Sequence, residues 1–455
     1  MKTIDSVAAV FCNKGRIFAI RRQSHLQAFP GYDSFPGGKI DEQDARSQHS
    51  ARLLRDLDGQ KMHALVREIL EELKYDLPAG IASGQVTAVK FLATALAPPL
   101  AQVRFHLHFF RVDLNEPLQF TADPGEIMDT FWETPRQLLN RFHAGDALMV
   151  PPMLWILEKL DKDPQGCNFG DLSPRFDEEN LVPILEPLSG LQILPVPSNT
   201  FPPEKRTNLF LLGDENSPRI LVDPSPESPK VLQKLLRTLQ QKNINAVFLT
   251  HHHHDHHEHA PELAKSLNIP VWMGEDTRRL IFQQHGSDYF SGVRVEIKQA
   301  GERLTDWKSE AVRVYSVPGH DTGQLALAPD SLRWFIVGDL IQSLGTVVIA
   351  APEGDMSAYF QTLEKIIDLN PAVIIPSHGM PMRGTFRLQA TLQHRREREK
   401  TIRQLHSEGK TKAEMLAIIY RGVDQRLLPF AMENIKSHLI KLQRQFLKFN
   451  APDDS

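Results

Sequence analysis

The sequence NAVFLTHHHHDHHEHA, residues 245–260, joins a short apolar run to a dense group of potential metal ligands. The apolar run has the length and composition of a buried β-strand, and the polar residues after it are typical of a loop. A histidine run alone is also typical of a tag or a low-complexity metal-binding tract. The spacing of the residues therefore has to show whether they form a defined metal site. The pattern HxHxDH requires an aspartate followed directly by a histidine, and Asp255 is the only aspartate in the run. This register predicts His251, His253, Asp255 and His256 as metal ligands.

Three motifs further along the chain add candidate ligands. SVPGHDTG contains His320, FIVGDL contains Asp339 and IIPSHG contains His378, and each stands at the end of an apolar, strand-like run. Side chains in such positions can converge where loops meet at one edge of a sheet. A mixture of imidazoles and carboxylates suits Zn²⁺, with Mn²⁺ or Fe²⁺ as alternatives. The alternation of ligands in the first motif predicts two metal positions.

The chain from about Leu185 to Gln445 resembles the metallo-β-lactamase superfamily in the type and order of these motifs. The resemblance implies an αββα sandwich with two metal ions, which lower the pKa of bound water and stabilise charge at a phosphorus or carbonyl centre. Asp223 in ILVDPS stands where the family has a strand-end aspartate near the site, and we expect Asp255 to contribute to catalysis. The family's metal ligands match His251, His253 and His320 for one metal, Asp255, His256 and His378 for the other, and Asp339 between them.

Two segments narrow the resemblance within that superfamily. GDLIQSLGTVVIAAPEGDMSAYFQTLEKI (residues 338–366) and HRREREKTI (394–402) are similar to the lactamase-beta-2 group of single-stranded-RNA endonucleases. This similarity implies a phosphodiesterase acting on single-stranded RNA, with a small winged-helix-like helical domain at residues 386–455. The sequence departs from the family at Glu258 and His259, where glycines usually follow the first motif. Thioester hydrolysis of the glyoxalase-II kind uses the same ligands and is the alternative activity.

Charge is unevenly distributed along the chain. The formal net charge is -4, whereas residues 383–450 contain 15 Lys and Arg against 6 Asp and Glu. A basic segment beside a hydrolytic centre is typical of proteins that hold a polyanion such as RNA. A solvated helical surface explains the same composition equally well.

The N-terminal third contains a second group of candidate site residues. FPGGKIDEQD, residues 35–44, precedes the predicted helix ALVREILEEL, residues 64–73. Glu68 and Glu72 are four residues apart and share one helical face, with Glu71 beside them. Carboxylates so close repel one another unless cations neutralise them. A string of this kind is also common on exposed helices, so the surrounding residues matter.

Those surrounding residues resemble the Nudix box. Gly37 and Gly38 permit a tight approach of the loop, Arg67 can orient a neighbouring glutamate, and Glu126 in GEIMDTFWETP (residues 125–135) is a candidate extra ligand or base. The resemblance implies an α/β/α sandwich that cleaves a diphosphate linked to another group. Its Mg²⁺ or Mn²⁺ ions would be held by Glu68, Glu71 and Glu72.

Within the Nudix proteins, FPGGKIDEQD and GDALMVPPMLWILEKL (residues 145–160) are similar to coenzyme A diphosphatases. The sequence departs from the Nudix box at three points. Asp44 stands where the family has a glutamate, and the 22 residues between Asp44 and Arg67 are more than the family pattern has. Lys74 stands where the family has a glycine after the glutamate pair. We expect Glu72 to act in catalysis, with diphosphatase activity retained or reduced. A non-catalytic module that senses a nucleotide and regulates its neighbour is the alternative.

Length and composition set the expected organisation. A chain of 455 residues exceeds what one core usually supports. Its mean hydropathy is -0.31, and it lacks an apolar stretch of about 18 residues, so we expect no membrane span. Two cysteines cannot build a disulfide framework, which favours a cytoplasmic protein. We expect an α/β and α+β multidomain chain with a Nudix-like domain at 1–165, a linker at 166–184, a metallo-β-lactamase domain at 185–385 and the helical domain at 386–455.

Overall fold

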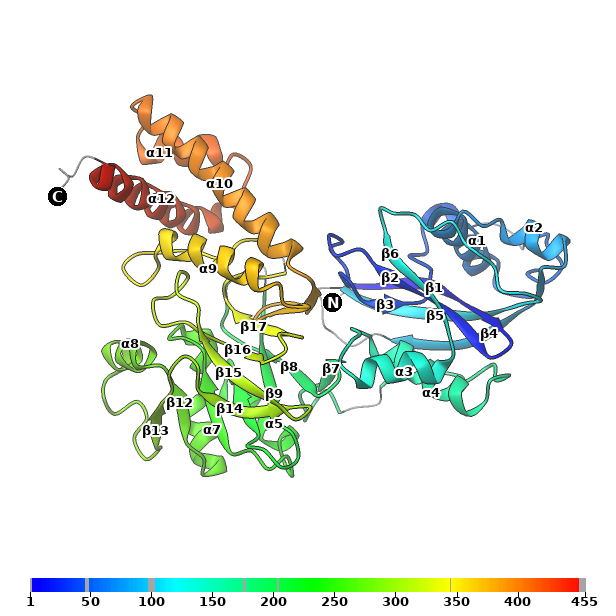
Figure 1. Cartoon of the computed structure of the whole chain (residues 1–455), viewed down its shortest axis with the longest axis horizontal. Coiled ribbons are helices and arrows are strands. Elements are labelled where there is room, and N and C mark those ends of the chain that lie inside the picture. The colour runs from blue at the N-terminus through cyan, green and yellow to red at the C-terminus, as the bar shows by residue number, and fades with distance from the viewer. Residues whose placement is uncertain are drawn as a thin grey trace. The chain divides into compact units, whose positions relative to one another are not determined.

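The structure is a computed structural model, and it describes residues 2–45, 49–96, 103–174, 177–202, 204–343 and 345–449. The chain forms two compact units (Figure 1), of which the first contains residues 1–194 and 380–383, and the second residues 195–379 and 384–455. Among the described residues, no helix is both long and apolar enough to cross a membrane.

The first unit is built on a mixed six-stranded sheet. The strands are β1 (Lys2–Asn13), β2 (Arg16–Arg22), β3 (Asp33–Ser34), β4 (Val86–Leu96), β5 (Val103–Leu114) and β6 (Ile127–Glu133). Their order is β3-β2-β1-β5-β4, with β6 paired to β2, and β1 runs parallel to β5 but antiparallel to β2. The helices are η1 (Glu42–Asp44), α1 (Gly59–Leu73), α2 (Leu77–Ala82), α3 (Pro135–His143) and α4 (Pro151–Lys162).

The alternation of side chains along β1 creates two cores in this unit. Val7 and Phe11 belong to the core that α1 and α2 cover, whereas Ala8 and Val10 belong to the core that α3 and α4 cover. Successive side chains of a strand point to opposite faces of the sheet, so one strand serves both layers. The predicted α/β/α sandwich is therefore confirmed.

Part of the segment expected as a linker, residues 166–184, is hydrogen-bonded to this sheet. Phe169 donates its backbone N–H to the carbonyl of Leu92 on β4 at 2.6 Å. The boundary between the two compact units follows Leu194, inside β8 (Leu191–Pro197). The four domain limits given above stay predictions.

The following residues, up to Arg383, form two further sheets, most of whose strands belong to the second unit. The first sheet contains, in hydrogen-bonded order, β7 (Leu185–Leu188), β8, β9 (Arg206–Leu212), β10 (Ile220–Val222), β11 (Ala246–Leu249), β12 (Val271–Met273) and β13 (Val295–Ile297). The second contains β14 (Arg303–Trp307), β15 (Glu310–Ser316), β16 (Leu325–Pro329), β17 (Phe335–Gly338), β18 (Val373–Pro376) and β19 (Met382–Arg383). The helices are α5 (Pro229–Thr238), α6 (His254–His257), α7 (Ala260–Leu267), α8 (Glu275–His285) and α9 (Met356–Leu369).

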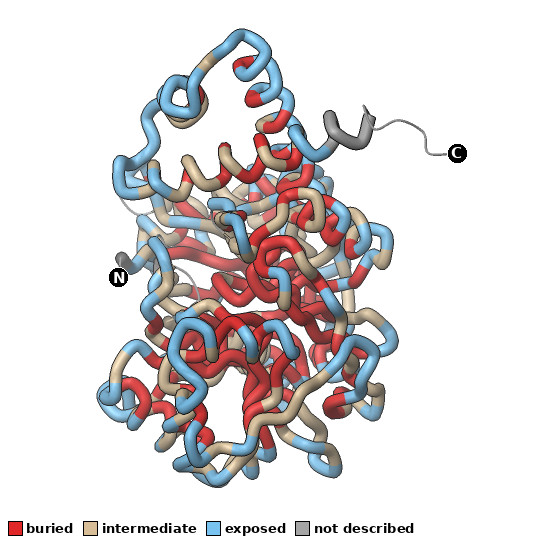
Figure 2. The backbone as a smooth tube through the Cα atoms, turned by 90° about the vertical axis from the view of Figure 1, so that its left-hand side faces the viewer, coloured by how far each residue is buried: buried red, intermediate tan, exposed pale blue. Residues whose placement is uncertain are grey.

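Central strands of these sheets are shielded from solvent, as the red interior segments of Figure 2 show. Residues 220–222 of β10, 246–249 of β11 and 335–337 of β17 are all 0% exposed. Strands buried on both faces form continuous apolar runs rather than alternating patterns, which explains the sequences AVFL and FIVG. Helices flank the sheets, with α7 in contact with β11 (Figure 1), and the predicted αββα sandwich is confirmed.

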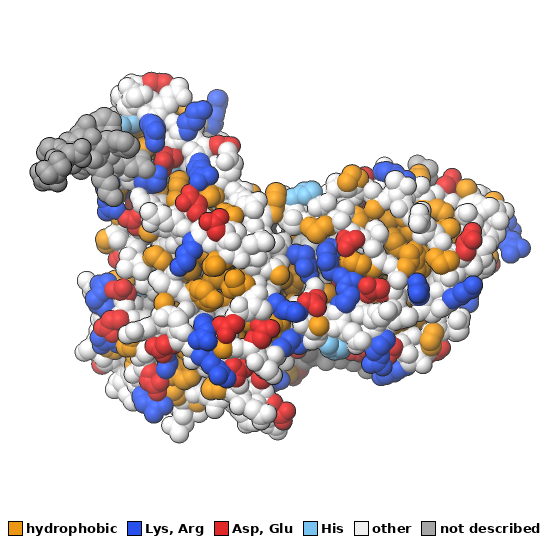
Figure 3. Space-filling view, viewed as in Figure 1, with side chains coloured by type: hydrophobic (Ala, Val, Ile, Leu, Met, Phe, Trp, Pro, Cys, Tyr) orange, Lys and Arg blue, Asp and Glu red, His pale blue; other side chains and the backbone are white. Residues whose placement is uncertain are grey.

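Helices form the C-terminal part of the second unit, as predicted. They are α10 (Phe386–Ser407), α11 (Lys412–Ile419), η2 (Gln425–Leu427) and α12 (Leu428–Phe449), and Figure 3 shows Lys and Arg side chains over their surface. Ile402, Met415 and Ile435 share a small apolar core. The buried Glu399 on α10 accepts two hydrogen bonds of 2.7 Å from Lys441 on α12, which ties the first and last helices together.

We expect Leu65→Ala to destabilise the first unit by about 2–5 kcal/mol, because this fully buried α1 side chain would leave a cavity. Leu70→Ala on the same helix is the matched control. Leu70 is 49% exposed, and its loss should change the free energy of unfolding by less than about 0.5 kcal/mol. Urea denaturation combined with hydrogen exchange in α1 measures both. An equal loss of unfolding free energy in the two variants would contradict the burial of Leu65 on the inner face of α1.

Candidate metal centres

The predicted ligands of the second unit follow the carboxyl ends of buried strands. His251 lies two residues after β11, Asp339 directly after β17, and His378 two residues after β18. His320 lies in the loop between β15 and β16. Because β10 is parallel to β11, and β17 to β18, these ends meet at the same edge of their sheets. The structure thus brings the ligands together, while their binding of metal stays a prediction.

Three imidazoles form the first cluster. His253 Nδ1 lies 3.0 Å from His251 Nε2 and 2.9 Å from His320 Nε2. Burial lowers the pKa of His251 well below its ordinary value and lowers the pKa of His253 to about 3. These imidazoles are therefore neutral at physiological pH, which is the form that binds a metal ion.

The second cluster contains Asp255, His256 and His378, and Asp339 lies between the two clusters. Asp339 Oδ2 is 3.5 Å from His256 Nε2, 3.4 Å from His378 Nε2 and 3.7 Å from His320 Nε2. Asp255 Oδ2 is 3.5 Å from His378 Nε2. Burial acts to raise the pKa of Asp339, but His378 and His256 hold that pKa well below its ordinary value. An ionised carboxylate facing both sets of imidazoles suits a bridging position.

Hydrogen bonds behind the imidazoles orient two of them. His320 Nδ1 lies 2.7 Å from the carbonyl of Val348, and His378 Nδ1 lies 3.0 Å from the carbonyl of Arg206. A carbonyl oxygen can only accept, so each Nδ1 carries the proton and donates it. The lone pair of each ring is consequently on Nε2, the atom that faces the clusters.

Asp223 holds two of the motifs in place. Its carboxylate accepts hydrogen bonds from Thr250 N at 2.8 Å and from Thr250 Oγ1 at 2.6 Å, and it lies 2.9 Å from His256 Nδ1. The backbone of Asp223 has a φ of 52°, a left-handed conformation that aspartate tolerates better than most residues. Asp223 is thus a positioning residue behind His256 rather than a member of either cluster.

Several atoms of the clusters show that a cation fits here. His256 Nε2, His378 Nε2 and Asp339 Oδ1 are buried and have no hydrogen-bond partner among the described residues. Unpaired buried polar atoms of this kind cost free energy. Imidazole nitrogens and carboxylate oxygens are the atoms that Zn²⁺ prefers in combination. The residues present therefore fit the metal pair that the family implies.

A cavity of about 1040 Å³ opens beside the clusters, and helix α10 supplies cationic groups to its lining. Arg387 donates to the carbonyl of Gly345 at 2.8 Å. Arg395 is only 2% exposed, and both its Nε and Nη1 of Arg398 are buried without a hydrogen-bond partner. None of the described residues forms an ion pair with these three arginines. His253, Asp255, His320, Asp339 and His378 also line this cavity.

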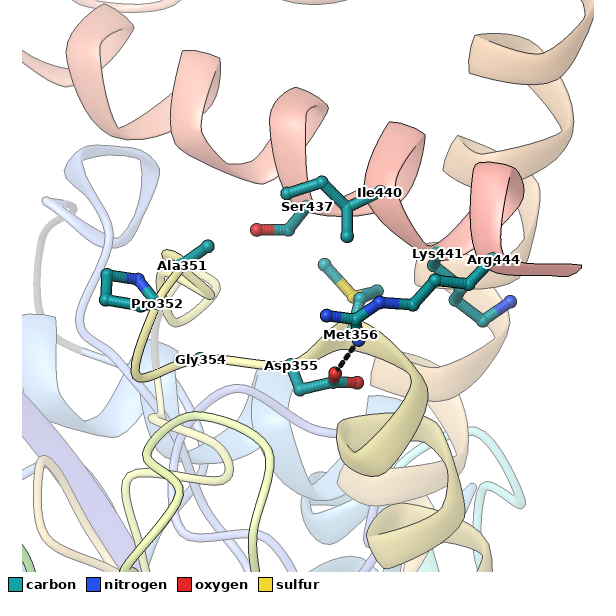
Figure 4. Close-up of a pocket in the computed structure, with 9 residues that line it drawn as sticks. All are labelled: Ala351, Pro352, Gly354, Asp355, Met356, Ser437, Ile440, Lys441 and Arg444. Atoms are coloured by element: carbon teal, nitrogen blue, oxygen red, sulfur yellow. Dashed lines mark hydrogen bonds and ion pairs between the residues drawn. The ribbon is translucent and has the colours of Figure 1, made fainter. Parts of the chain in front are cut away.

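A second cavity, of about 230 Å³, lies between the start of α9 and helix α12 (Figure 4). Its cationic side chains are already paired. Arg444 forms an ion pair with Asp355, which Figure 4 marks, and Lys441 is paired with Glu399 at 2.7 Å. The small cavity therefore differs from the large one, whose three arginines have no ion-pair partner among the described residues.

In the first unit, two glycines permit the predicted carboxylate site. Gly37 N donates to Glu72 Oε2 at 2.8 Å, and a β-carbon at this position would lie 2.1 Å from the carbonyl oxygen of Val7. A β-carbon on Gly38 would lie 2.4 Å from the carboxylate of Glu68. A side chain at position 37 would collide with the backbone, and one at position 38 would displace the carboxylate of Glu68, which explains the pair of glycines.

The carboxylates of this site repel one another. Glu72 is 2% exposed, and burial raises its pKa to about 8, while the charges of Glu68 and Glu126 act in the same direction. Burial also raises the pKa of Glu68. A divalent cation would neutralise this repulsion, and carboxylate oxygens are the ligands that Mg²⁺ uses. The residues present thus fit the metal that the Nudix resemblance implies.

Arg67 organises the edge of the same site. It donates to both carboxylate oxygens of Asp44, at 3.2 and 2.9 Å, to Glu68 Oε1 at 2.8 Å and to the carbonyl of Lys39 at 2.9 Å. The expected orienting role of Arg67 therefore has a geometric basis. The side chain of Glu71 is 58% exposed and pairs with Arg67 at 3.2 Å, so it lies at the solvent edge of the cluster.

Two departures from the family patterns do not change the local backbone. Lys74, which replaces a glycine after α1, has a φ of 52°, and His259, which replaces one after α6, has a φ of 56°. Both residues thus adopt the left-handed conformation that glycine adopts most easily, at a cost of about 1–2 kcal/mol each. Glu258 accepts two hydrogen bonds from Asn199 Nδ2, at 3.0 and 2.8 Å.

Sequence reasoning missed some residues of these sites. His252 and Asp321 are both buried and are joined by a hydrogen bond directly behind the first cluster. Asp321 follows His320 in SVPGHDTG, so the motif held the signal. Arg395 and Arg398 were counted only as part of a basic segment, because the position of α10 beside the cavity depends on tertiary packing.

Three protein-family models match the chain. The NUDIX domain matches residues 2–152, the Metallo-beta-lactamase superfamily matches residues 203–378, and the Beta-lactamase associated winged helix domain matches residues 411–445. The first two segments contain the carboxylate and imidazole sites described above, and the third contains α11 and most of α12, whereas α10 lies outside the matched segments.

Individual relatives agree with these models. The chain is 31% identical over 251 residues to the Beta-lactamase-like protein 2 homolog of Drosophila melanogaster, a match that covers 52% of this chain and 82% of the relative. It is 28% identical over 168 residues to a Hydroxyacylglutathione hydrolase of Hamiltonella defensa, covering 37% of this chain and 59% of that relative. A beta-lactamase domain protein from Burkholderia ambifaria has a crystal structure with a TM-score of 0.50 and 22% identity, covering 60% of this chain and 90% of that chain, and supports the fold alone.

The fold, the convergence of the ligands and these matches agree with one another. The buried imidazoles and carboxylates lie within the segment that the superfamily model matches. The glutamate cluster lies within the segment of the NUDIX model. The chain belongs to the metallo-β-lactamase superfamily, and it is a hydrolase that also carries a NUDIX domain and a β-lactamase-associated winged-helix domain.

Proposed function

We propose that the metallo-β-lactamase part hydrolyses phosphodiester bonds of single-stranded RNA. The observation that carries this proposal is the set of three arginines on α10, Arg387, Arg395 and Arg398, which line the same cavity as the predicted metal ligands. A buried guanidinium without a counter-charge is costly. The phosphates of a bound strand would supply the missing negative charge. A thioester substrate offers fewer anionic groups to these arginines.

Aromatic side chains support the same substrate class. The rings of Phe201 and Phe430, both in the cavity lining, lie 4.5 Å apart between centroids. Tyr420 lies under the guanidinium of Arg398, at 4.4 Å from its ring centroid. Stacking platforms beside cationic groups are the usual means of binding single-stranded nucleic acid. The cavity thus offers both kinds of contact.

In this proposal the clusters hold two divalent cations, most favourably Zn²⁺, through the residues predicted from the sequence. Such a pair supplies a nucleophile at neutral pH and stabilises developing charge on oxygen. Asp223 keeps His256 oriented, and the backbone carbonyls behind His320 and His378 fix their tautomers. We assign Asp255, whose carboxylate lines the cavity, to orientation of the attacking water. The arginines of α10 hold the phosphates on either side of the scissile bond.

Thioester hydrolysis is the second candidate for this centre. Several relatives are named hydroxyacylglutathione hydrolase, at 26–28% identity. The same metal ligands serve that reaction, because a carbonyl carbon and a phosphorus centre are activated alike. Parallel assays on single-stranded RNA, on a hydroxyacylglutathione and on an acyl-coenzyme A separate the two candidates. Turnover of thioesters without cleavage of RNA would replace the first proposal by the second.

For the NUDIX domain we propose hydrolysis of a diphosphate in a nucleoside-diphosphate-linked compound such as coenzyme A, with Mg²⁺ or Mn²⁺. Glu68, Glu71 and Glu72 are its proposed ligands, with Glu72 acting in catalysis and Gly37, Gly38 and Arg67 positioning them. A nucleotide-sensing module without catalysis is the second candidate, and Asp44 at the glutamate position favours it. Binding of coenzyme A in Mg²⁺ without turnover would support that candidate.

Asp339→Asn should remove metal from the second unit, because it takes away the one carboxylate that faces His256, His320 and His378. We expect this variant to retain one or two fewer zinc ions per chain than the wild type, and the rate of RNA cleavage to fall by about 100-fold or more. Metal analysis after dialysis and a cleavage assay measure the two effects. Asp330→Asn, at an exposed aspartate paired with Arg313, is the control. Full metal content in Asp339→Asn would exclude a bridging role.

Arg398→Gln should weaken RNA binding and leave thioester turnover unchanged. For each lost phosphate contact to a single strand, the slope of log K against log salt falls by about 0.7. We therefore expect a several-fold higher KM for RNA with that change in slope. Arg403→Gln is the matched control, because Arg403 lies on the same helix with 64% of its side chain exposed. An unchanged slope in Arg398→Gln would rule out its contact with phosphate.

Mg²⁺ binding to the NUDIX domain should release close to one proton at pH 7, because the pKa of Glu72 in the metal-free protein is raised to about 8. Affinity should accordingly increase from pH 6 to pH 8 and then level off, since the acid must lose its proton to bind the cation. Calorimetry in buffers of different ionisation enthalpy measures the release. Glu72→Gln should abolish it, while the exposed Glu116→Gln should not. Binding that is independent of pH would contradict this assignment.

A further inference from the structure

Three histidines outside the two clusters come together at the surface of the second unit. His254 and His257 are on α6, and His285 is the last residue of α8. One ring nitrogen of each lies within 4.8 Å of the corresponding atoms of the other two. Their ring centroids are 5.4 to 5.9 Å apart. The histidine run thus contributes to a second convergence, which the HxHxDH pattern does not include.

The tautomer of His257 is fixed by the backbone. Its Nε2 lies 2.9 Å from the carbonyl of His252, which can only accept, so Nε2 carries the proton. The lone pair is therefore on Nδ1, which lies 2.9 Å from the hydroxyl of Tyr289. A carbonyl that holds the proton on one nitrogen and leaves the other as an acceptor is the arrangement by which proteins orient a histidine ligand. A metal ion at Nδ1 would take the place of the hydrogen bond from the Tyr289 hydroxyl. His257 itself is 0% exposed, so its orientation is fixed by packing as well.

The other two histidines make this cluster accessible to solvent. Both His254 and His285 are exposed, and 52% of the side chain of His254 faces water. The ring of Tyr289 packs against the ring of His285 at 4.7 Å between centroids. His254 also lines the cavity beside the buried clusters, so an ion could reach this cluster from solution or from that cavity.

We propose that His254, His257 and His285 form a third metal site, for a transition-metal cation such as Zn²⁺ or Cu²⁺. Three imidazoles with an open fourth position are a ligand set that both ions accept, whereas Mg²⁺ and Ca²⁺ require oxygen ligands. The Tyr289 hydroxyl, or water, completes the coordination. His254 and His257 are interleaved in sequence with predicted ligands of the buried centre, but none of the three proposed ligands is itself a predicted ligand of that centre.

The test is a zinc titration of the full-length chain followed by metal analysis. Millimolar Mg²⁺ is present throughout, so that the NUDIX carboxylates are occupied. We expect His285→Ala to bind one zinc ion per chain fewer than the wild type, and His406→Ala, at an exposed histidine on α10, to bind the same number. Because His285 is exposed, its replacement leaves the core intact. Equal zinc binding by His285→Ala and the wild type would overturn the proposal.

A spectroscopic measurement identifies the ligands independently of the count. After the tight sites are filled with Zn²⁺, one equivalent of Cu²⁺ is added and its electron paramagnetic resonance spectrum is recorded. The proposal expects nitrogen hyperfine splitting from imidazoles in the wild type and in His406→Ala, and its loss in His285→Ala. The same splitting in all three proteins would place the copper elsewhere and refute the third site.

Discussion

Neutralisation of buried charge is the constraint on which both hydrolytic centres depend. Asp339 lies within 3.7 Å of three imidazoles and is only 8% exposed, at the lining of the large cavity. In the NUDIX domain, burial raises the pKa values of both Glu68 and Glu72, and the charge of Glu68 raises the pKa of Glu72 further. Groups of this kind are costly to bury unless a cation or a counter-charge accompanies them. The fully buried strands hold them in place, so the stability of the core maintains the geometry of each site.

The same reasoning connects the metallo-β-lactamase centre with its helical appendage. Helix α10 is tied to α12 through the buried pair of Glu399 and Lys441, which fixes the side of α10 that faces the cavity. That side carries Arg395 and Arg398, and one nitrogen of each, Nε of Arg395 and Nη1 of Arg398, is buried without a protein partner among the described residues. Helix α10, which precedes the segment that the winged-helix model matches, thus contributes cationic side chains to the cavity. A substrate that brings its own negative charge completes this arrangement.

Local sequence patterns predicted most of the fold and the candidate set of metal ligands. The apolar run before His251 and the spacing around Asp255 predicted both a buried strand and its ligands, because a strand end and its loop are set by neighbouring residues. The contacts that orient these ligands could not be predicted from local patterns. Asp223 and Thr250, or Gly38 and Glu68, meet only when segments far apart in sequence pack together. The third histidine cluster was missed for the same reason, since His285 is distant from α6 along the chain.

Anomalous X-ray diffraction at the zinc absorption edge, from crystals of the zinc-loaded protein, tests the central claim most directly. The account predicts one peak about 2.0–2.2 Å from the facing nitrogens of His251, His253 and His320, and another at similar distance from Asp255, His256 and His378. Asp339 should contact both. The absence of any peak among these residues in fully loaded crystals would contradict the account.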